Sequence, residues 1–188
     1  MGMKSIVIRL TLVCSLISTG TYAQSDFVEY VTAVDYMELP FNIDPDTVSY
    51  SSRKPFDLHL IDQYIEKGMP GAILYPDGPS YHPVSRFKSK SYQDALIVAK
   101  YDHRDVRDDY YLIVYDKNGA IISKMIIAQS LRDCTKQITQ SCTIDRNHII
   151  NCTITTWQEN CEKYDPEHIV SKTYNINNNG IITELKND

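Results

Sequence analysis

The stretch Tyr110-Tyr-Leu-Ile-Val-Tyr-Asp-Lys-Asn-Gly-Ala-Ile-Ile-Ser-Lys-Met-Ile-Ile-Ala128 contains two apolar runs separated by a turn-forming segment, Asp116 to Gly119. Asp-x-Asn-Gly suits a type I turn followed by a residue at positive φ, where Asn and Gly cost least. Two further segments have a similar form and precede two isoleucines each: Asp145-Arg-Asn-His148 and Asn177-Asn-Asn-Gly180. The three segments predict three β-hairpins.

Apolar runs around these turns predict the strands of a sheet. Residues 94–101, 110–115 and 120–128 are apolar at both odd and even positions, which is typical of strands with both faces covered. Residues 81–87 predict a weaker strand that forms a fourth hairpin with 94–101. We expect about eight strands in an antiparallel meander, either a curved sheet or an up-and-down barrel, with a propeller-like fragment as the alternative.

Residues 24–80 differ from the rest because six prolines divide them into short pieces. Two pieces have apolar residues at helical spacing. In the first these residues are Phe27, Tyr30, Val31, Val34 and Met37. The second helix is predicted from Leu58 to Lys67, with Asp57 as its N-cap. We therefore expect a mainly β (α+β) domain in which one or two N-terminal helices pack on a sheet formed by residues 81–188.

The first 23 residues have the composition and order of a secretory signal peptide. Lys4 and Arg9 come before the apolar run Leu10–Ile17. Small residues follow this run up to Ala23, after which we expect cleavage. The run is shorter than the roughly 20 residues of a membrane-spanning helix. We expect a periplasmic or secreted protein with no membrane span in its mature form.

The charge balance argues against nucleic acid as a partner. Cleavage would remove Lys4 and Arg9, leaving 17 of 19 basic residues against 24 acidic residues, a net charge of −7. The acidic residues are scattered along the chain. A surface that binds phosphates needs clustered Lys and Arg, so the sequence predicts no nucleic-acid binding.

The second turn fixes which residues of its hairpin oppose one another. A type I turn with a bulge pairs Asp145 with Ile149, and the same register places Cys142 opposite Cys152. One face of the hairpin then holds Ile138, Cys142, Ile144, Ile150, Cys152 and Ile154. The other face holds Thr139, Ser141, Thr143, Asn151, Thr153 and Thr155. This separation of apolar from hydroxyl-bearing residues is typical of a half-buried hairpin.

Four cysteines follow the signal peptide, and an even count in an exported chain favours disulfides. We predict nested bridges, Cys142 with Cys152 and Cys134 with Cys161, the second closing the far end of the same hairpin. The alternative is two local bridges, Cys134 with Cys142 and Cys152 with Cys161. Their spacing contains no Cys-x-x-Cys, so we expect no zinc site.

No catalytic signature is present in the sequence. It lacks a Gly-x-Ser-x-Gly elbow, a His-Glu-x-x-His motif, a phosphate loop and a dinucleotide fingerprint. Oxidised cysteines would leave no thiol nucleophile. The five histidines lie in five different segments: His59, His82, His103, His148 and His168. We therefore predict no catalytic residue, no metal and no cofactor.

The densest polar segment is Asp102-His-Arg-Asp-Val-Arg-Asp-Asp109, which does not match the spacing of a calcium loop. Its acids could form a cation site or a partner-binding loop, and the bland alternative is a solvated connection. The candidate residues of a partner-binding loop are Asp102, His103, Asp105, Asp108 and Asp109. The leading functional hypothesis is an exported, non-enzymatic binding or inhibitor (immunity-type) protein whose partner is another protein. The alternatives are a barrel that carries a small apolar ligand and an exported hydrolase.

Overall fold

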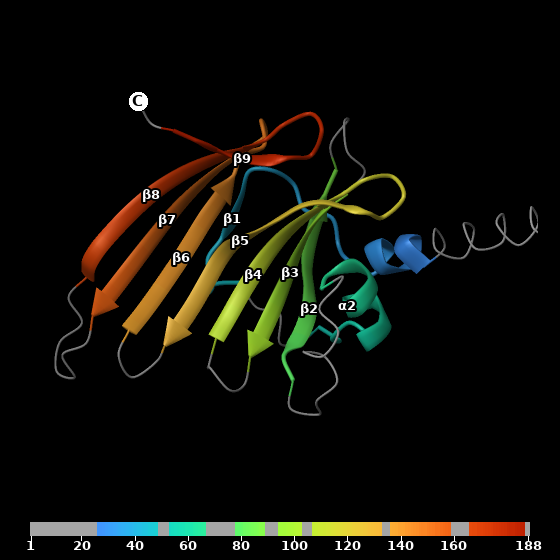
Figure 1. Ribbon diagram of the computed structural model, residues 1–188, viewed down its shortest axis with the longest axis horizontal. Helices are drawn as coiled ribbons and strands as arrows, with labels where there is room; N and C mark the ends of the chain where they lie inside the picture. Colours follow the sequence, from blue (N-terminus) through green and yellow to red (C-terminus); the bar gives the residue numbers. More distant parts are fainter. Residues whose placement is uncertain are drawn as a thin grey trace, which may run out of the picture.

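The computed structural model describes residues 26–48, 53–66, 78–88, 94–102, 107–132, 136–158 and 166–186. Its strands form one antiparallel sheet in which each strand from β2 to β9 pairs with the next along the chain (Figure 1). The strands are β1 (Phe41–Ile43), β2 (Ser80–Phe87), β3 (Asp94–Asp102), β4 (Arg107–Tyr115), β5 (Ile121–Arg132), β6 (Lys136–Ile144), β7 (Ile149–Gln158), β8 (Pro166–Ile176) and β9 (Ile182–Leu185). The predicted mainly β meander is confirmed.

All three predicted turns are present, and the first residue of each holds the turn with its side chain. In the β4–β5 turn, Asp116 Oδ1 accepts the backbone N–H groups of Asn118 at 2.8 Å and Ala120 at 2.9 Å. Asp145 and Asn177 accept the equivalent pairs in the β6–β7 and β8–β9 turns. The fourth residue of each turn has positive φ: Gly119 at 81°, His148 at 62° and Gly180 at 79°.

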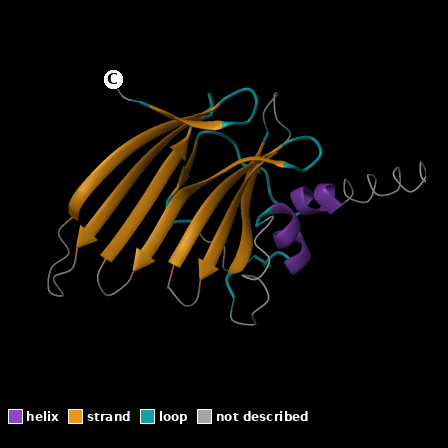
Figure 2. Cartoon of the chain, in the orientation of Figure 1, coloured by secondary structure: helices purple, strands orange, loops and turns teal. Residues whose placement is uncertain are grey.

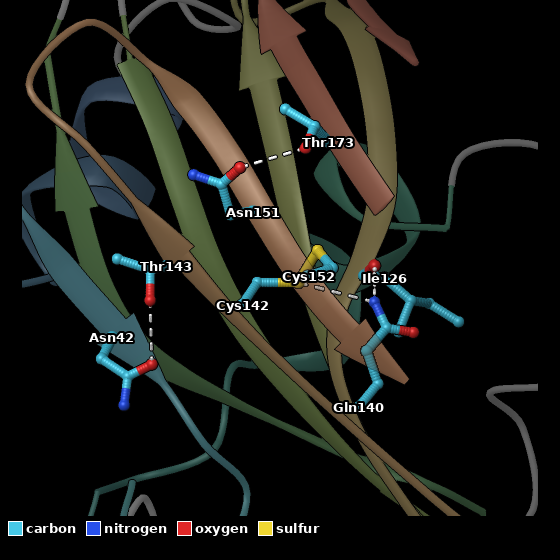
Figure 3. Close-up of a disulfide and its surroundings, with 8 residues drawn as sticks. All are labelled: Asn42, Ile126, Gln140, Cys142, Thr143, Asn151, Cys152 and Thr173. Carbon is cyan, nitrogen blue, oxygen red and sulfur yellow. Dashed lines mark hydrogen bonds between the residues drawn. A yellow bond between two sulfur atoms is a disulfide. The ribbon is translucent and has the colours of Figure 1, made fainter. Parts of the chain in front are cut away.

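The register predicted for the second hairpin is also confirmed (Figure 3). Cys142 lies opposite Cys152, and the two form a disulfide with a Cα–Cα distance of 4.0 Å. Both sulfurs are buried in the core, whereas Asn151 and Thr153 on the opposite face are exposed. The second predicted bridge, between Cys134 and Cys161, lies outside the described residues.

The sheet does not close, so of the two predicted forms the curved sheet is correct and the barrel is wrong. Strands β5 and β6 pair only over Gln129–Arg132 and Gln137–Gln140. Beyond that point β1 pairs with β6, with Phe41 opposite Ile144 (Figure 1). The sequence did not predict β1, a three-residue strand that meets its partner about a hundred positions later in the chain.

Two helices cover one face of the sheet at the β2 end (Figure 2). They are formed by residues 26–32 and by α2 (Leu58–Tyr64). A buried aromatic cluster joins them to the sheet, with Tyr30 stacked on Tyr64 at a ring distance of 5.1 Å. Tyr115 of β4 donates its hydroxyl to the backbone oxygen of Tyr64 at 2.6 Å, which ties the end of α2 to the sheet.

The opposite face of β2–β4 packs against β1 and the strands from β5 onward. The buried cluster between them includes Ile97 of β3, Leu112 of β4, Ile43 of β1 and the Cys142–Cys152 disulfide of β6 and β7. Side chains therefore fill the core on this face of the sheet. The closed barrel on which the carrier hypothesis was based is not formed.

Helix α2 is shorter than the predicted Leu58–Lys67. It ends at Tyr64, with Ile65 as its C-cap, and Asp57 occupies the N-cap position without a hydrogen bond from its side chain. The predicted cap is therefore correct in position and wrong in chemistry. Lys54 lies 3.9 Å from the Asp57 carboxylate, so a weak ion pair is the interaction described for this side chain.

Candidate functional site

A cavity of about 430 Å³ lies between the helix of residues 26–32, strand β2 and the β4–β5 turn. We call it the cationic pocket because its charged lining residues are three cations and one acid: Arg86, Lys88, Lys117 and Asp94. The whole chain has a net charge of −5, so this concentration of positive charge is unusual for the molecule. The volume falls in the range typical of small-molecule sites, roughly 300–1,000 Å³.

The β4–β5 turn and the first helix meet without a gap at one side of the pocket. A Cβ atom placed on Gly119 would lie 2.6 Å from Cγ of Phe27, so only glycine fits beneath this ring. The Phe27 ring also lies 5.3 Å from the Tyr115 ring. This close approach places Lys117 of the turn beside the helix, where both line the pocket.

Arg86 is the most constrained cation of the pocket. Its backbone N–H donates to the oxygen of Asp35 and its own oxygen accepts from Met37, both at 2.9 Å, so residues on either side of Tyr36 hold it in place. The guanidinium carbon lies 4.0 Å from the centre of the Tyr36 ring. This is a distance at which cation–π attraction operates.

The guanidinium of Arg86 is only partly neutralised. Its Nη1 lies 3.8 Å from Oδ1 of Asp94, and the two side chains are 12% and 3% exposed. Among the described residues, Nε of Arg86 is buried and has no hydrogen-bond partner. A buried donor without a partner costs roughly 1–3 kcal/mol, so the charge of this guanidinium, and not its Nε–H, is what the pocket presents to a ligand.

Lys88 and Lys117 extend the positive charge toward the solvent. A hydrogen bond with Tyr36 and the negative charge of Asp94 raise the pKa of Lys88, so its ammonium group stays protonated at neutral pH. Lys117 belongs to the β4–β5 turn and is exposed. Three cations against the single carboxylate of Asp94 leave a net charge of +2 on the pocket.

A second cavity of about 410 Å³ lies between the two helices, and its charges are mixed. It is lined by three acids, Glu29, Asp35 and Asp57, and by two cations, Arg53 and Lys54. Arg53 lies 3.6 Å from Asp35. Three acids and two cations leave a net charge of −1 on this cavity, so it does not share the positive charge of the cationic pocket.

The predicted partner-binding loop is described only in part. His103 and Asp105 lie outside the described residues, while Asp102 and Asp108 are half-buried strand residues. Asp109 is 4% exposed and accepts hydrogen bonds from Arg107 and Gln129, at 2.8 and 3.0 Å, and from the Tyr111 hydroxyl at 3.3 Å. Its partners are thus within the protein, and the loop stays a prediction.

A second buried carboxylate forms a closed network at the end of α2. Glu66 accepts the Tyr81 hydroxyl at 2.8 Å and lies 3.2 Å from the ammonium of Lys124, which also donates to the oxygen of Ile65. Burial, followed by the charge of Glu66, raises the pKa of Tyr81 strongly. Sequence reasoning missed this network, although a lysine within the apolar run 120–128 is a signal for it.

The four described histidines lie in four different parts of the fold. His82 contacts the oxygen of Arg53 and the hydroxyl of Ser80, His148 belongs to the β6–β7 turn, and His59 and His168 are exposed on α2 and β8. Within the described ranges, no three His, Cys, Asp or Glu residues are grouped so as to hold a metal ion. Nor does this part of the chain contain a helix long and apolar enough to cross a membrane.

Comparison with protein-family models, with curated proteins and with solved structures finds no match for this chain. The function is therefore argued from the site alone. The sequence did not predict the cationic pocket, because Arg86 and Lys117 are separated in the chain by two strands. The alternation of Arg86, Lys88 and Lys90 is the signal that could have pointed to it.

Proposed function

We propose that this chain is an exported, non-enzymatic binding protein that holds a negatively charged group of its ligand in the cationic pocket. The observation that carries the proposal is the excess of cations over acids around one cavity of an acidic protein. Charge-assisted hydrogen bonds from Arg and Lys to anions are stronger than neutral ones.

Two features of the chain support export. Residues 1–23 have the order of a signal peptide, and disulfides such as Cys142–Cys152 persist in oxidising compartments. Expression of the full chain in a bacterial host, followed by mass measurement of the periplasmic protein, tests this part. The expected product begins at Gln24, and full-length protein confined to the cytoplasm would contradict it.

The binding part is tested by titrating the purified protein with the fluorescent anion 8-anilinonaphthalene-1-sulfonate. The double variant Lys88→Gln/Lys117→Gln removes two charges from the pocket and should weaken binding on the order of tenfold, or about 1.4 kcal/mol. Both side chains belong to the exposed side of the pocket, so the fold should tolerate the change.

The matched control is Lys54→Gln/Lys186→Gln. It changes the net charge of the protein by the same amount, and neither residue lines the cationic pocket. If the control weakens binding as much as the pocket variant, the probe responds to overall charge. The proposal would then be wrong.

A further inference from the structure

The cationic pocket has two walls of different chemistry, and we infer from them that its ligand is an amphiphilic acid, with one anionic head joined to an apolar body. The inference rests on the proposed function and adds the class of the ligand. The cations line the pocket from β2 and the β4–β5 turn, whereas the facing wall is the helix of residues 26–32.

The helical wall is apolar. Phe27 and Val31 are 3% and 4% exposed and form its base, while Val28, 53% exposed, stands at the opening. Thr32 also lines the pocket, but its hydroxyl lies within hydrogen-bonding distance of the helix's own backbone oxygens, those of Val28 at 2.8 Å and Glu29 at 3.1 Å. The apolar surface that this wall offers a ligand is therefore mainly that of Val28.

The facing wall offers positive charge suited to an anionic head. The exposed ammonium groups of Lys88 and Lys117 supply this charge near the solvent, and the Arg86 guanidinium, whose Nε is closed to solvent, adds charge behind them. An anionic head beside the two lysines would keep part of its hydration shell. Inorganic phosphate could satisfy this wall but would leave the apolar surface of Val28 in water.

Burial of apolar surface and charge pairing predict different responses along a homologous series. Each buried methylene contributes about 0.8 kcal/mol, which corresponds to an affinity gain of about fourfold. Titration calorimetry with acetate, butanoate, hexanoate and octanoate should therefore show binding that strengthens up to about fourfold per methylene until the apolar wall is covered. Octanamide, which has the same body without the charge, should bind at least tenfold more weakly than octanoate.

Variants measure the contribution of each wall to binding separately. Val28→Asn should flatten the dependence on chain length, whereas Lys88→Gln/Lys117→Gln should weaken every acid by a similar factor. Leu58→Asn is the control for Val28→Asn, because Leu58 is equally exposed, at 57%, on the other helix and does not line the pocket. It should leave the series unchanged.

The outcomes distinguish the amphiphilic ligand from the proposed anion-binding function on which it rests. Equal affinity for acetate, phosphate and octanoate would support an anion site and contradict an amphiphilic ligand. Equal affinity for octanoate and octanamide would overturn both, as would the absence of binding by any acid. Flotation with vesicles of anionic phospholipid separates a free acid from a lipid headgroup: capture by vesicles without octanoate binding would contradict a free amphiphilic ligand.

Discussion

Substitution of Gly119 by alanine tests the contact that sets the first helix on the sheet. Two effects act at this position. An alanine would occupy φ 81°, a left-handed conformation that costs an L-residue about 1–2 kcal/mol. Its Cβ would also lie 2.6 and 2.7 Å from two ring carbons of Phe27, so the ring must move.

The two effects differ in size and can be added. Gly→Ala also lowers the entropy of the unfolded chain, which stabilises the folded protein by about 0.4–1 kcal/mol. The net conformational cost of Gly119→Ala is therefore about 1 kcal/mol. Overpacking of a well-packed contact costs about 1–3 kcal/mol. We expect Gly119→Ala to lower the free energy of unfolding by about 3 kcal/mol, and Tm by roughly 6–12 °C.

Gly180 provides the matched control, since it occupies the same position of the β8–β9 turn at φ 79°. Gly180→Ala should carry the conformational cost without the displacement of Phe27, about 1 kcal/mol. Urea denaturation with the disulfide intact measures both variants. In a Phe27→Ala background the added methyl has no ring to displace, so Gly119→Ala should then also cost about 1 kcal/mol. Equal losses for Gly119→Ala and Gly180→Ala in the wild-type background would refute the reasoning.

Two further predictions concern the β6–β7 hairpin. The double variant Cys142→Ala/Cys152→Ala opens a bridge across a sequence separation of 10 and should lower the free energy of unfolding by about 2–3 kcal/mol; an unchanged urea midpoint would contradict this. Burial lowers the pKa of His148 below 6.5, so the unfolded chain takes up the proton first and stability should fall as the pH drops from 7 through 6.5 toward 5. His148→Asn tolerates the same positive φ without titrating and should reduce that fall in pH-dependent denaturation curves; a fall of unchanged size would exclude His148 as its source.

The part of the fold that the sequence predicts is the part made by local interactions. In the β6–β7 turn, the Asp145 side chain accepts hydrogen bonds from backbone N–H groups two and four residues later. A sequence of four or five residues therefore determines the geometry of the turn. From that turn the register follows along two strands, and it correctly places Cys142 opposite Cys152. Alternation of apolar and polar residues then separates the two faces of the hairpin.

The remainder depends on residues that are distant in the chain. A barrel would need the end strands β2 and β9 to pair, and β1 pairs with β6 in the middle of the sheet; no pattern within these strands encodes either outcome. The cationic pocket likewise requires Arg86, Lys117 and the first helix to meet in space. Charge density in the sequence does not show which acids are exposed: Asp109, at the end of the acidic loop, is buried among partners within the protein.

Pairing of β1 with β6 also orders the events of folding. Every contact between neighbouring strands from β2 to β9 closes a short loop, whereas the hydrogen bond from Thr143 to Asn42 spans 101 positions. By loop-closure entropy, joining such a span costs about 2–3 kcal/mol more than closing a turn of a few residues. The meander can therefore form first and β1 dock onto it afterwards, so the part of the domain synthesised earliest is among the last to reach its place.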